Sequence, residues 1–359
     1  MNINLKIIIL LLLIIFLFFL LFFEERVEFS LRYLLASIGS LWYSEEIIGK
    51  DGFGNSLNLD FFQKPAVSYI EEGKGLIFAQ KINGRWKKEV VDSTALSGNK
   101  TSLVFDKEGK PYILYIDKNF ILKLAIKESD FWKIEKISEN VALSVNLIFD
   151  KDNNPYLSFW KTDEGLALGR KIEEGWKTEI IDKGEVGWWN SLAIDDKNNI
   201  HLSYFDFENK NLLYLFFDGE NWRKEIVDFE GDVGRFNSIS VDKKGKPHIS
   251  YFDEGNLWLK YTKKEKGGWI IEKPDKKGIL GEKTNIVLDE NDNPIISYFD
   301  FKNKDFRLAW KKNEEWKVQI LDLKEEVGGD NFLISDKENN LHLIWQDLTK
   351  RKLKYKILK

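Results

Sequence analysis

Two short segments of the chain hold the side chains best suited to contact a ligand. Trp188-Trp189 and Arg235-Phe236 each lie a few residues before the end of an apolar run that closes with an aspartate. Two indoles, a phenyl ring and a guanidinium can stack on a sugar or on an aromatic side chain, and such groups dominate the binding energy of protein interfaces. We predict that these four residues form part of a ligand-binding surface. The alternative is that the rings only fill the space between neighbouring elements.

A second group of candidates comes from acidic residues that recur along the chain and once change sign. The acids are Glu71, Asp117, Asp206, Asp253, Asp300 and Asp347, and Lys161, which follows Trp160, interrupts the series. Acids at strand ends usually cap turns, whereas a ring of carboxylates would face a cationic ligand. We therefore include Trp160, Lys161, Asp206 and Asp253 among the candidate ligand-binding residues.

An internal repeat that runs through most of the chain must position these residues. A tryptophan followed three residues later by an acid or amide recurs every 44 to 47 residues, at Trp42, Trp86, Trp132, Trp176, Trp222, Trp269 and Trp316. In phase with it, an aspartate closes a short apolar run at Asp60, Asp106, Asp150, Asp195, Asp242, Asp289 and Asp336. Each unit contains four short runs of β-branched or aromatic residues separated by Gly, Asn and Asp, which is typical of a four-stranded repeat.

The arrangement of the units predicts an all-β fold, a seven-bladed β-propeller of four-stranded antiparallel blades. Six units are complete, and the carboxyl-terminal unit lacks its tryptophan-bearing fourth run. Residues 42–48 supply that run from the other end of the chain, so this strand should close the last blade and leave no open sheet edge. The first run of each unit has no Lys, Arg or Glu, and we expect burial to fall from this strand, near the axis, to the fourth.

The units resemble the NHL-type propeller repeat. The fifth unit shows the likeness, since Ser238-Ile-Ser-Val-Asp242 precedes Gly245-Lys-Pro-His-Ile-Ser-Tyr-Phe-Asp253. The resemblance covers residues 41–359, rests on strand pattern and turn residues, and implies the propeller fold without any catalytic residue. Sialidase-like propellers are more distantly similar, because their Ser-x-Asp-x-Gly-x-x-Trp motif is absent from this sequence.

The segments between units combine constant and variable positions. A glycine lies four residues before the first strand of most units, at Gly52, Gly98, Gly187, Gly234, Gly281 and Gly328, which suggests a positive φ. The residue just before that strand is Asn55, Thr101, Asn190, Asn237, Thr284 or Asn331. Between these positions lie two residues that follow no rule, as in Trp188-Trp189. Loops held by a rigid scaffold commonly carry binding residues, so we expect ligand recognition at this rim.

The amino terminus predicts a membrane anchor. Ile7 to Phe23 is a run of 17 apolar residues, near the lower limit for a helix that crosses a bilayer. It ends in charged residues rather than in a small-residue cleavage site, so we expect an uncleaved anchor in residues 1–26, a stalk in 27–40 and the propeller in 41–359. The flanking charges favour a single-pass protein with its propeller on the extracytoplasmic side. Cleavage of the segment would instead give a secreted protein.

Composition and charge exclude several functions. The net charge is -4 and cysteine is absent, so we expect no nucleic-acid partner, no disulfide and no thiolate metal site. His201, His248 and His342 occupy one repeat position on different blades, too far apart to share a metal ion, and we predict no metal or cofactor. The sequence favours a membrane-tethered binding module for a glycan or a protein. The alternatives are a structural component of an envelope complex, and a hydrolase or lyase that acts on glycans.

Overall fold

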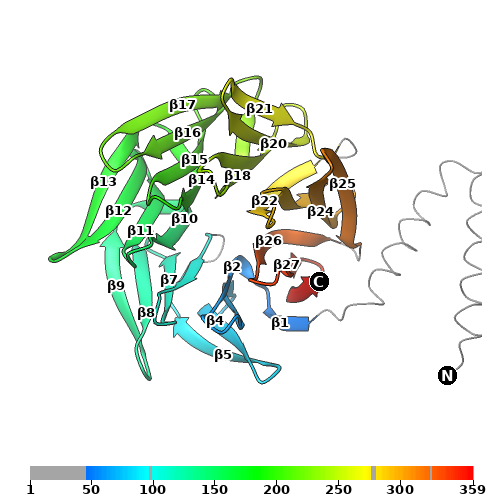
Figure 1. Cartoon of the computed structure of the whole chain (residues 1–359). Helices are drawn as coiled ribbons and strands as arrows, with labels where there is room; N and C mark the ends of the chain where they lie inside the picture. Colours follow the sequence, from blue (N-terminus) through cyan, green and yellow to red (C-terminus); the bar gives the residue numbers. More distant parts are fainter. Residues whose placement is uncertain (1–45, 97–98, 276–279, 324–325, 359) are drawn as a thin grey trace, which may run out of the picture. The chain divides into compact units, whose positions relative to one another are not determined.

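The described part of the chain forms one β-propeller. The computed structural model describes residues 46–96, 99–275, 280–323 and 326–358, and these contain 28 strands in seven four-stranded sheets (Figure 1). Every strand pairing within the sheets is antiparallel, as in the pair β2–β3. Innermost strands of successive blades contact one another, and β26 contacts β2, so the blades form a closed ring. The prediction of seven four-stranded antiparallel blades is confirmed.

Each of the first four blades runs in chain order from its innermost to its outermost strand. The first contains β2 (Phe53–Leu59), β3 (Pro65–Glu71), β4 (Gly75–Ile82) and β5 (Arg85–Asp92). The second contains β6 (Ser102–Phe105), β7 (Pro111–Ile116), β8 (Leu122–Lys127) and β9 (Trp132–Ser138). The third contains β10 (Val141–Phe149), β11 (Pro155–Lys161), β12 (Gly165–Ile172) and β13 (Gly175–Lys183). The fourth contains β14 (Val186–Ile194), β15 (Ile200–Asp206), β16 (Asn211–Phe217) and β17 (Trp222–Asp228).

The remaining three blades complete the ring in the same order. The fifth contains β18 (Val233–Val241), β19 (Pro247–Asp253), β20 (Trp258–Glu265) and β21 (Gly268–Glu272). The sixth contains β22 (Leu280–Leu288), β23 (Pro294–Asp300), β24 (Asp305–Lys312) and β25 (Glu315–Asp322). The seventh contains β26 (Val327–Ser335), β27 (Leu341–Asp347), β28 (Lys352–Leu358) and, from the other end of the chain, β1 (Glu46–Lys50).

The last blade is closed by the amino-terminal strand. β1 pairs with β28, with Glu46 opposite Tyr355 and Lys50 opposite Lys352 (Figure 1). The predicted closure is therefore confirmed, although the strand continues two residues beyond the predicted end at 48. Residues 42–45, the predicted anchor within 1–26 and the predicted stalk 27–40 lie outside the described residues. Among the residues described, no helix is long and apolar enough to cross a membrane.

Burial peaks in the second strand of the blades rather than in the first. All residues of β3, β15 and β19 are buried, whereas the innermost strands are only partly buried and β5, at the outer edge, has no buried residue. The expected fall from first strand to fourth is thus wrong at the axis. The innermost strands border hollows at both ends of the ring, and water reaches one side of them there.

The repeated tryptophan and its acid join neighbouring blades. Trp316 of the sixth blade donates from Nε1 to Glu272 of the fifth at 2.8 Å, and Lys311 pairs with the same carboxylate at 2.8 Å. The same arrangement recurs where Trp86, Trp176 and Trp269 donate to Glu46, Glu135 and Glu225. At Glu135, Glu225 and Glu272 the acid of the Trp-x-x-Glu pattern therefore serves the tryptophan of the next unit, whereas Nε1 of Trp132 is buried without a partner among the described residues.

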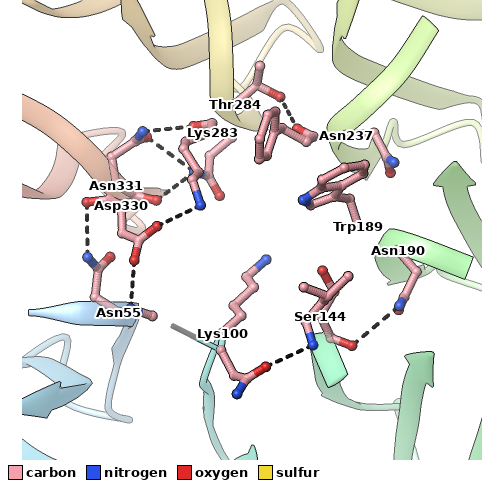
Figure 2. A pocket seen from close by; sticks show the side chains of 15 residues that line it. Asn55, Lys100, Ser144, Trp189, Asn190, Asn237, Lys283, Thr284, Asp330 and Asn331 are labelled. Carbon is pink, nitrogen blue, oxygen red and sulfur yellow. Dashed lines mark hydrogen bonds and ion pairs between the residues drawn. The ribbon is translucent and has the colours of Figure 1, made fainter. Parts of the chain in front are cut away.

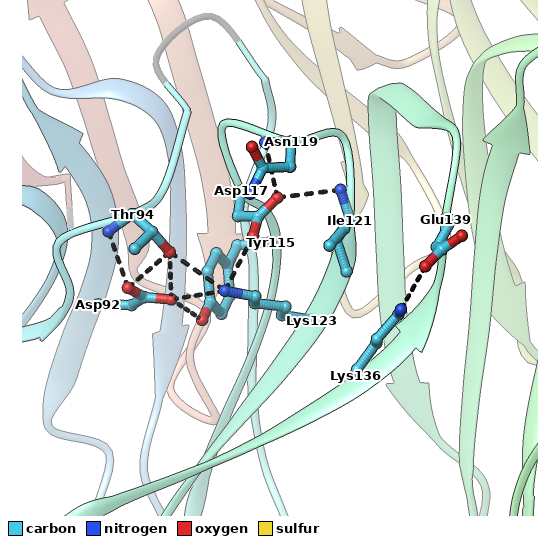
Figure 3. A network of polar contacts seen from close by, with 9 residues as sticks. All are labelled: Asp92, Thr94, Tyr115, Asp117, Asn119, Ile121, Lys123, Lys136 and Glu139. Atoms are coloured by element: carbon cyan, nitrogen blue, oxygen red, sulfur yellow. Dashed lines mark hydrogen bonds and ion pairs between the residues drawn. The ribbon is translucent and has the colours of Figure 1, made fainter.

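A half-buried cation links neighbouring blades at the end of the second strand. Lys123 lies 3.4 Å from Asp92 of the preceding blade and 2.9 Å from Asp117 of its own, and the Tyr115 hydroxyl donates to Asp92 at 2.5 Å (Figure 3). Asp117 also accepts the backbone N–H groups of Asn119 and Ile121. Equivalent buried cations are Lys260, Arg307 and Lys354. In these blades the acid that closes the second strand both caps a turn and neutralises a cation.

The aspartate that closes the first strand caps a turn in all seven blades. In the sixth blade, Oδ1 of Asp289 accepts the backbone N–H groups of Asn291 and Asn293, each at 2.8 Å. The same two bonds are made by Asp60, Asp106, Asp150, Asp195, Asp242 and Asp336. These turns occupy the end of the ring where the innermost strands finish, and they serve the scaffold.

Candidate functional site

A pocket lies on the propeller axis at the end where the innermost strands begin (Figure 2). Its volume is about 120 Å³, and every blade contributes to its lining. We call it the axial pocket and define it by the second residue of each variable pair: Gly54, Lys100, Ser144, Trp189, Phe236, Lys283 and Asp330. The two rule-free positions of the interblade loops are therefore not equivalent. In most blades the second faces the axis and the first does not.

An unusual backbone conformation holds several of these side chains at the axis. Trp189, Phe236 and Lys283 have φ values of 48°, 49° and 55°, in the left-handed region that non-glycine residues rarely adopt. The glycine two residues earlier also has a positive φ, for example 110° at Gly234. There a Cβ atom would lie 2.8 Å from the Cα of Leu212 in the preceding blade, so only glycine fits. Such strain is found where surrounding structure enforces it, and it clusters at functional sites.

Hydrogen bonds between blades hold the strained residues. In five blades the Asn or Thr that follows the variable pair donates from its side chain to the carbonyl of the axial-pocket residue in the preceding blade. Thr284 donates to Phe236 at 2.9 Å, and Asn331 donates to Lys283 at 2.7 Å. The same contact joins Asn55 to Asp330, Thr101 to Gly54 and Asn190 to Ser144. The ring of amides and hydroxyls thus braces the pocket wall from blade to blade.

The second strands of five blades complete this ring, and one acceptor is left without a partner. A serine in the second strand bonds the Asn or Thr of the next blade, as when Ser297 donates to Oδ1 of Asn331 at 2.8 Å. The seventh blade has Ile344 at the equivalent position, and the next residue in the ring is Asn55. Oδ1 of Asn55 is consequently buried without a hydrogen-bond partner among the described residues. An unsatisfied acceptor therefore lies in a residue of the pocket lining.

The axial pocket has an aromatic wall. The rings of Trp189 and Phe236 lie 4.8 Å apart at an angle of 52°, and both residues line the pocket, into which Trp189 points (Figure 2). Behind Trp189 lie Phe205, at 5.5 Å, and the guanidinium of Arg235, at 5.6 Å from the indole. The aromatic wall is thus supported from the outside by further rings and a cation.

A charged wall faces the aromatic one. Nζ of Lys283 lies 3.1 Å from Oδ1 of Asp330, and Oδ2 of Asp330 accepts the backbone N–H of Gly54 at 2.7 Å (Figure 2). Burial alone would raise the pKa of Asp330, but Lys283 and the Gly54 N–H hold it below its usual value. Asp330 is therefore an ionised carboxylate whose charge is already compensated.

Lys100 is the third charged residue of this wall, and its side chain is half-buried. Its side chain points toward the centre of the pocket (Figure 2), and its Nζ lies 5.8 Å from the ring of Phe332. The side chain is surrounded by protein within the pocket although water still reaches it. This burial lowers the pKa of Lys100 to about 8, with Asp330 opposing the shift and Lys283 adding to it.

The structure brings the predicted aromatic residues together in two adjoining groups, one at the axis and one at the outer edge of the rim. Trp188 points away from the axis, where its ring lies 4.7 Å from Trp160 and stacks on Phe207 at 4.5 Å. The indole Nε1 atoms of Trp160 and Trp188 are both buried, and neither has a hydrogen-bond partner in the described part of the chain. Trp189 and Phe236 belong to the axial pocket, so the cluster extends from the axis to the outer edge of the rim.

Arg235 supports the aromatic wall rather than facing the pocket. Its Nε and one terminal nitrogen bind the two oxygens of Asp232 at 3.1 and 3.0 Å, and its guanidinium lies 5.2 Å from the ring of Phe205. The hydrogen bonds from Arg235 to Asp232 raise the pKa of the guanidinium. This side chain is thus committed to contacts within the protein.

The three charged candidates at the second-strand ends have partners of their own. Lys161 pairs with Glu164 at 2.7 Å. Asp206 accepts the backbone N–H of Asn209 at 3.0 Å, and Asp253 lies 2.8 Å from Lys260. These contacts agree with the turn-capping interpretation, and a role for these residues in ligand binding stays a prediction.

Sequence reasoning did not single out Lys100, Lys283 or Asp330. All three occupy the second of the two variable positions, and this shared position was the signal that could have found them. In a closed ring, equivalent residues of seven blades converge on one axis, whereas the chain order separates them by more than 40 residues. A site built one residue per blade therefore leaves no local motif.

The histidines lie away from this pocket and are buried inside blades. Nδ1 of His201 lies 2.7 Å from the Tyr214 hydroxyl on the adjacent strand, and His248 and His342 make the same contact with Tyr261 and Tyr355. Burial lowers the pKa of all three imidazoles. No group of three metal-ligating side chains occurs in the described ranges.

The fold and the pocket identify the class of this protein as a seven-bladed β-propeller. No protein-family model matches the chain, and the comparison with curated proteins found no relative. An ulvan lyase, titled as a new family of polysaccharide lyase, superimposes with a TM-score of 0.59 at 13% identity, over 87% of this chain and 95% of its own. The Aleuria aurantia lectin, solved with Fucalpha1-6GlcNAc, gives 0.52 at 10% identity, over 76% and 97%.

A third similar structure is AofleA from Arthrobotrys oligospora, with a TM-score of 0.52 at 12% identity, over 77% of this chain and 89% of its own. Identities this low show a common propeller fold. The fold implied by the NHL-type resemblance is therefore confirmed, while the NHL family itself is not supported, because the similar structures include lectins and a lyase.

Proposed function

We propose that this protein is a binding module that holds a glycan in the axial pocket. The observation that carries the proposal is the pairing of an aromatic wall with a polar wall at one end of the ring. A sugar ring offers a C–H face that packs on Trp189 and Phe236, and hydroxyl groups that can bond the amides and charges opposite. Lectins among the structures of similar fold support the choice of ligand.

The outer part of the aromatic cluster extends the same surface. Trp160, Trp188 and Phe207 continue from Trp189 across the rim, and the two unsatisfied indole N–H groups need acceptors that sugar oxygens could supply after a small side-chain movement. A glycan longer than one residue would therefore run from the axis toward the third and fourth blades. Lys161 and Asp206 end the second strands of these two blades on the same face, and Asp253 ends that of the fifth.

A protein ligand is the second candidate, and exposed phenyl rings favour it. Phe207, Phe229 and Phe301 follow strands that end on the face of the axial pocket, and they are 45%, 69% and 51% exposed. Large exposed rings are typical of protein interfaces. A protein bound there would make the propeller a recognition or assembly component of an envelope complex.

We further propose that residues 7–23 anchor the chain in a membrane with the propeller on the extracytoplasmic side. The length of the apolar run and the charges beside it support this proposal. Protease treatment of intact cells should then degrade the propeller and leave the amino-terminal segment in the membrane. Protection of the propeller until the cells are broken would contradict the proposed orientation.

Screening of the purified full chain in detergent on a glycan array, followed by calorimetry with the best oligosaccharide, tests the binding function. We expect the double variant Trp189→Ala/Phe236→Ala to lose binding. Phe62→Ala, which removes a 73% exposed ring at the opposite end of the propeller, is the matched control and should bind normally.

A pull-down from envelope extracts tests the protein ligand, and accumulation of cleaved product from any bound glycan would show an enzyme instead.

A further inference from the structure

Lys100 differs from the other charged residues of the axial pocket because no acidic side chain of the described residues lies within bonding distance of it. Three charged residues line this pocket: Lys100, Lys283 and Asp330. Lys283 and Asp330 neutralise one another, and Asp330 also accepts the Gly54 N–H. For Nζ of Lys100, the described residues provide no hydrogen bond or ion pair, only the ring of Phe332 at 5.8 Å. The pocket therefore holds one uncompensated positive charge.

A buried cation without a counter-ion is costly, and a fold keeps one where something else supplies the negative charge. The other rim cation shows the contrast. Arg235 is half-buried like Lys100, but Asp232 binds two of its nitrogens at 3.1 and 3.0 Å. The four cations between blades, three of them buried, are likewise each matched by at least two aspartates, as Lys260 is by Asp228 and Asp253. Lys100 differs from these cations because no described aspartate or glutamate pairs with it.

Lys100 also lies where a ligand would meet it. Its side chain points to the pocket centre, across from the indole of Trp189 (Figure 2), and the ring of Phe236 lies 4.8 Å from that indole. A ligand that packs a ring against these aromatics places its substituents toward the charged wall.

Building on the proposed glycan binding, we propose that the axial pocket selects acidic sugars, whose carboxylate or sulfate group binds Nζ of Lys100 while the sugar ring packs on Trp189 and Phe236. A neutral sugar would satisfy the aromatic wall but leave the Lys100 charge buried and unpaired. An inorganic anion would pair with Lys100 but leave the aromatic wall without contact. An acidic sugar satisfies both walls at once.

Calorimetry with matched oligosaccharides tests this selectivity in the full chain. The probes are oligogalacturonides of two to four residues, their methyl esters, which lack the charge, a sulfated disaccharide and a neutral oligosaccharide. The variants are Lys100→Met, which keeps the length of the side chain without its charge, and Lys118→Met, an exposed lysine on the same face of the same blade, as the control. Thermal melting shows that each variant is folded.

We expect the wild type to bind one class of acidic oligosaccharide at least ten-fold more tightly than its uncharged counterpart. Lys100→Met should remove that preference while retaining weak binding of the neutral form, and Lys118→Met should leave it intact. Equal affinity for charged and uncharged probes, or a preference that survives in Lys100→Met, would overturn the acidic-sugar inference and leave glycan binding standing. Binding to none of the charged or neutral glycans would overturn both.

Discussion

The two ends of the propeller axis are built from the same seven strands but from different kinds of residues. Where the innermost strands finish, every blade has an aspartate, and each caps its turn in the same way. Where these strands begin, the seven axial positions hold Gly, Lys, Ser, Trp, Phe, Lys and Asp. The seven identical aspartates therefore belong to the scaffold. The seven axial positions differ from blade to blade, so their side chains can be changed to suit a ligand without loss of the fold.

The largest effect should come from the glycine that frames the variable end. Gly234→Ala should lower the free energy of unfolding by about 3 kcal/mol, because the new Cβ meets the Leu212 backbone at 2.8 Å and the residue has a φ of 110°. Denaturant unfolding measures the change. Gly267→Ala, at an exposed glycine with nothing within 4 Å of the added atom, should change stability little. Similar losses in the two variants would contradict the role of close packing at Gly234.

The aromatic wall should have the next largest effect, and on binding alone. Trp189→Ala should weaken glycan binding by about 2 kcal/mol, roughly thirty-fold, because a central aromatic contact is lost. Its melting temperature should stay close to that of the wild type, since the removed ring lines an open pocket. Calorimetry and thermal melting together test this separation. A variant that binds normally would show that the ligand does not occupy the axial pocket.

The repeated end should show the reverse pattern. Asp289→Ala removes the acceptor of two backbone N–H groups and should cost about 1–2 kcal/mol of stability without any change in glycan affinity. Glu220→Ala, an exposed acid whose side chain makes no described bond, should cost nothing measurable. If Asp289→Ala weakened ligand binding at unchanged stability, the two ends would not divide the roles as described.

The smallest effect is a gain of stability at Lys100, whose side chain is only half-buried, so that water offsets much of the cost of burying its charge. Burial lowers the pKa of this amine from 10.5 to about 8, so between these pH values the unfolded chain binds more protons than the folded one. The cost of burying the charge is present in full below pH 8 and is relieved as pH rises to about 10.5. Lys100→Met should therefore melt slightly above the wild type at pH 7, and the difference should shrink by pH 10. A lower melting temperature at pH 7 would show that the charge is compensated.

The fold could be predicted from the sequence because its determinants repeat. The period of the tryptophan and aspartate marks gives the number of blades, and the missing fourth strand of the last unit reveals how the ring closes. The positive φ predicted for the repeated glycines is confirmed at Gly52, Gly187, Gly234, Gly281 and Gly328. Burial in the innermost strands was overestimated, because a strand pattern does not show the hollows that form around an axis.

The site could be predicted only in part. The rim and its aromatic residues were identified, since Trp188-Trp189 and Arg235-Phe236 break the repeat. The direction of each side chain was not, because the left-handed φ of Trp189 and Phe236 turns them to the axis while Trp188 points outward. Lys100 was overlooked because its importance depends on the lack of an acidic partner from the other blades. That lack is visible only in the folded ring, where the seven loops meet.

Fluorine NMR of the full chain labelled with fluorotryptophan would test ligand binding in the axial pocket most directly. The chain has 13 tryptophans, and the Trp189 and Trp222 signals can be assigned from the spectra of Trp189→Phe and Trp222→Phe. On titration with a bound oligosaccharide, we expect the Trp189 signal to shift in a saturable manner while Trp222, on the outer strand β17, does not move. A saturable titration that leaves the Trp189 signal unchanged would contradict ligand binding at this end of the axis.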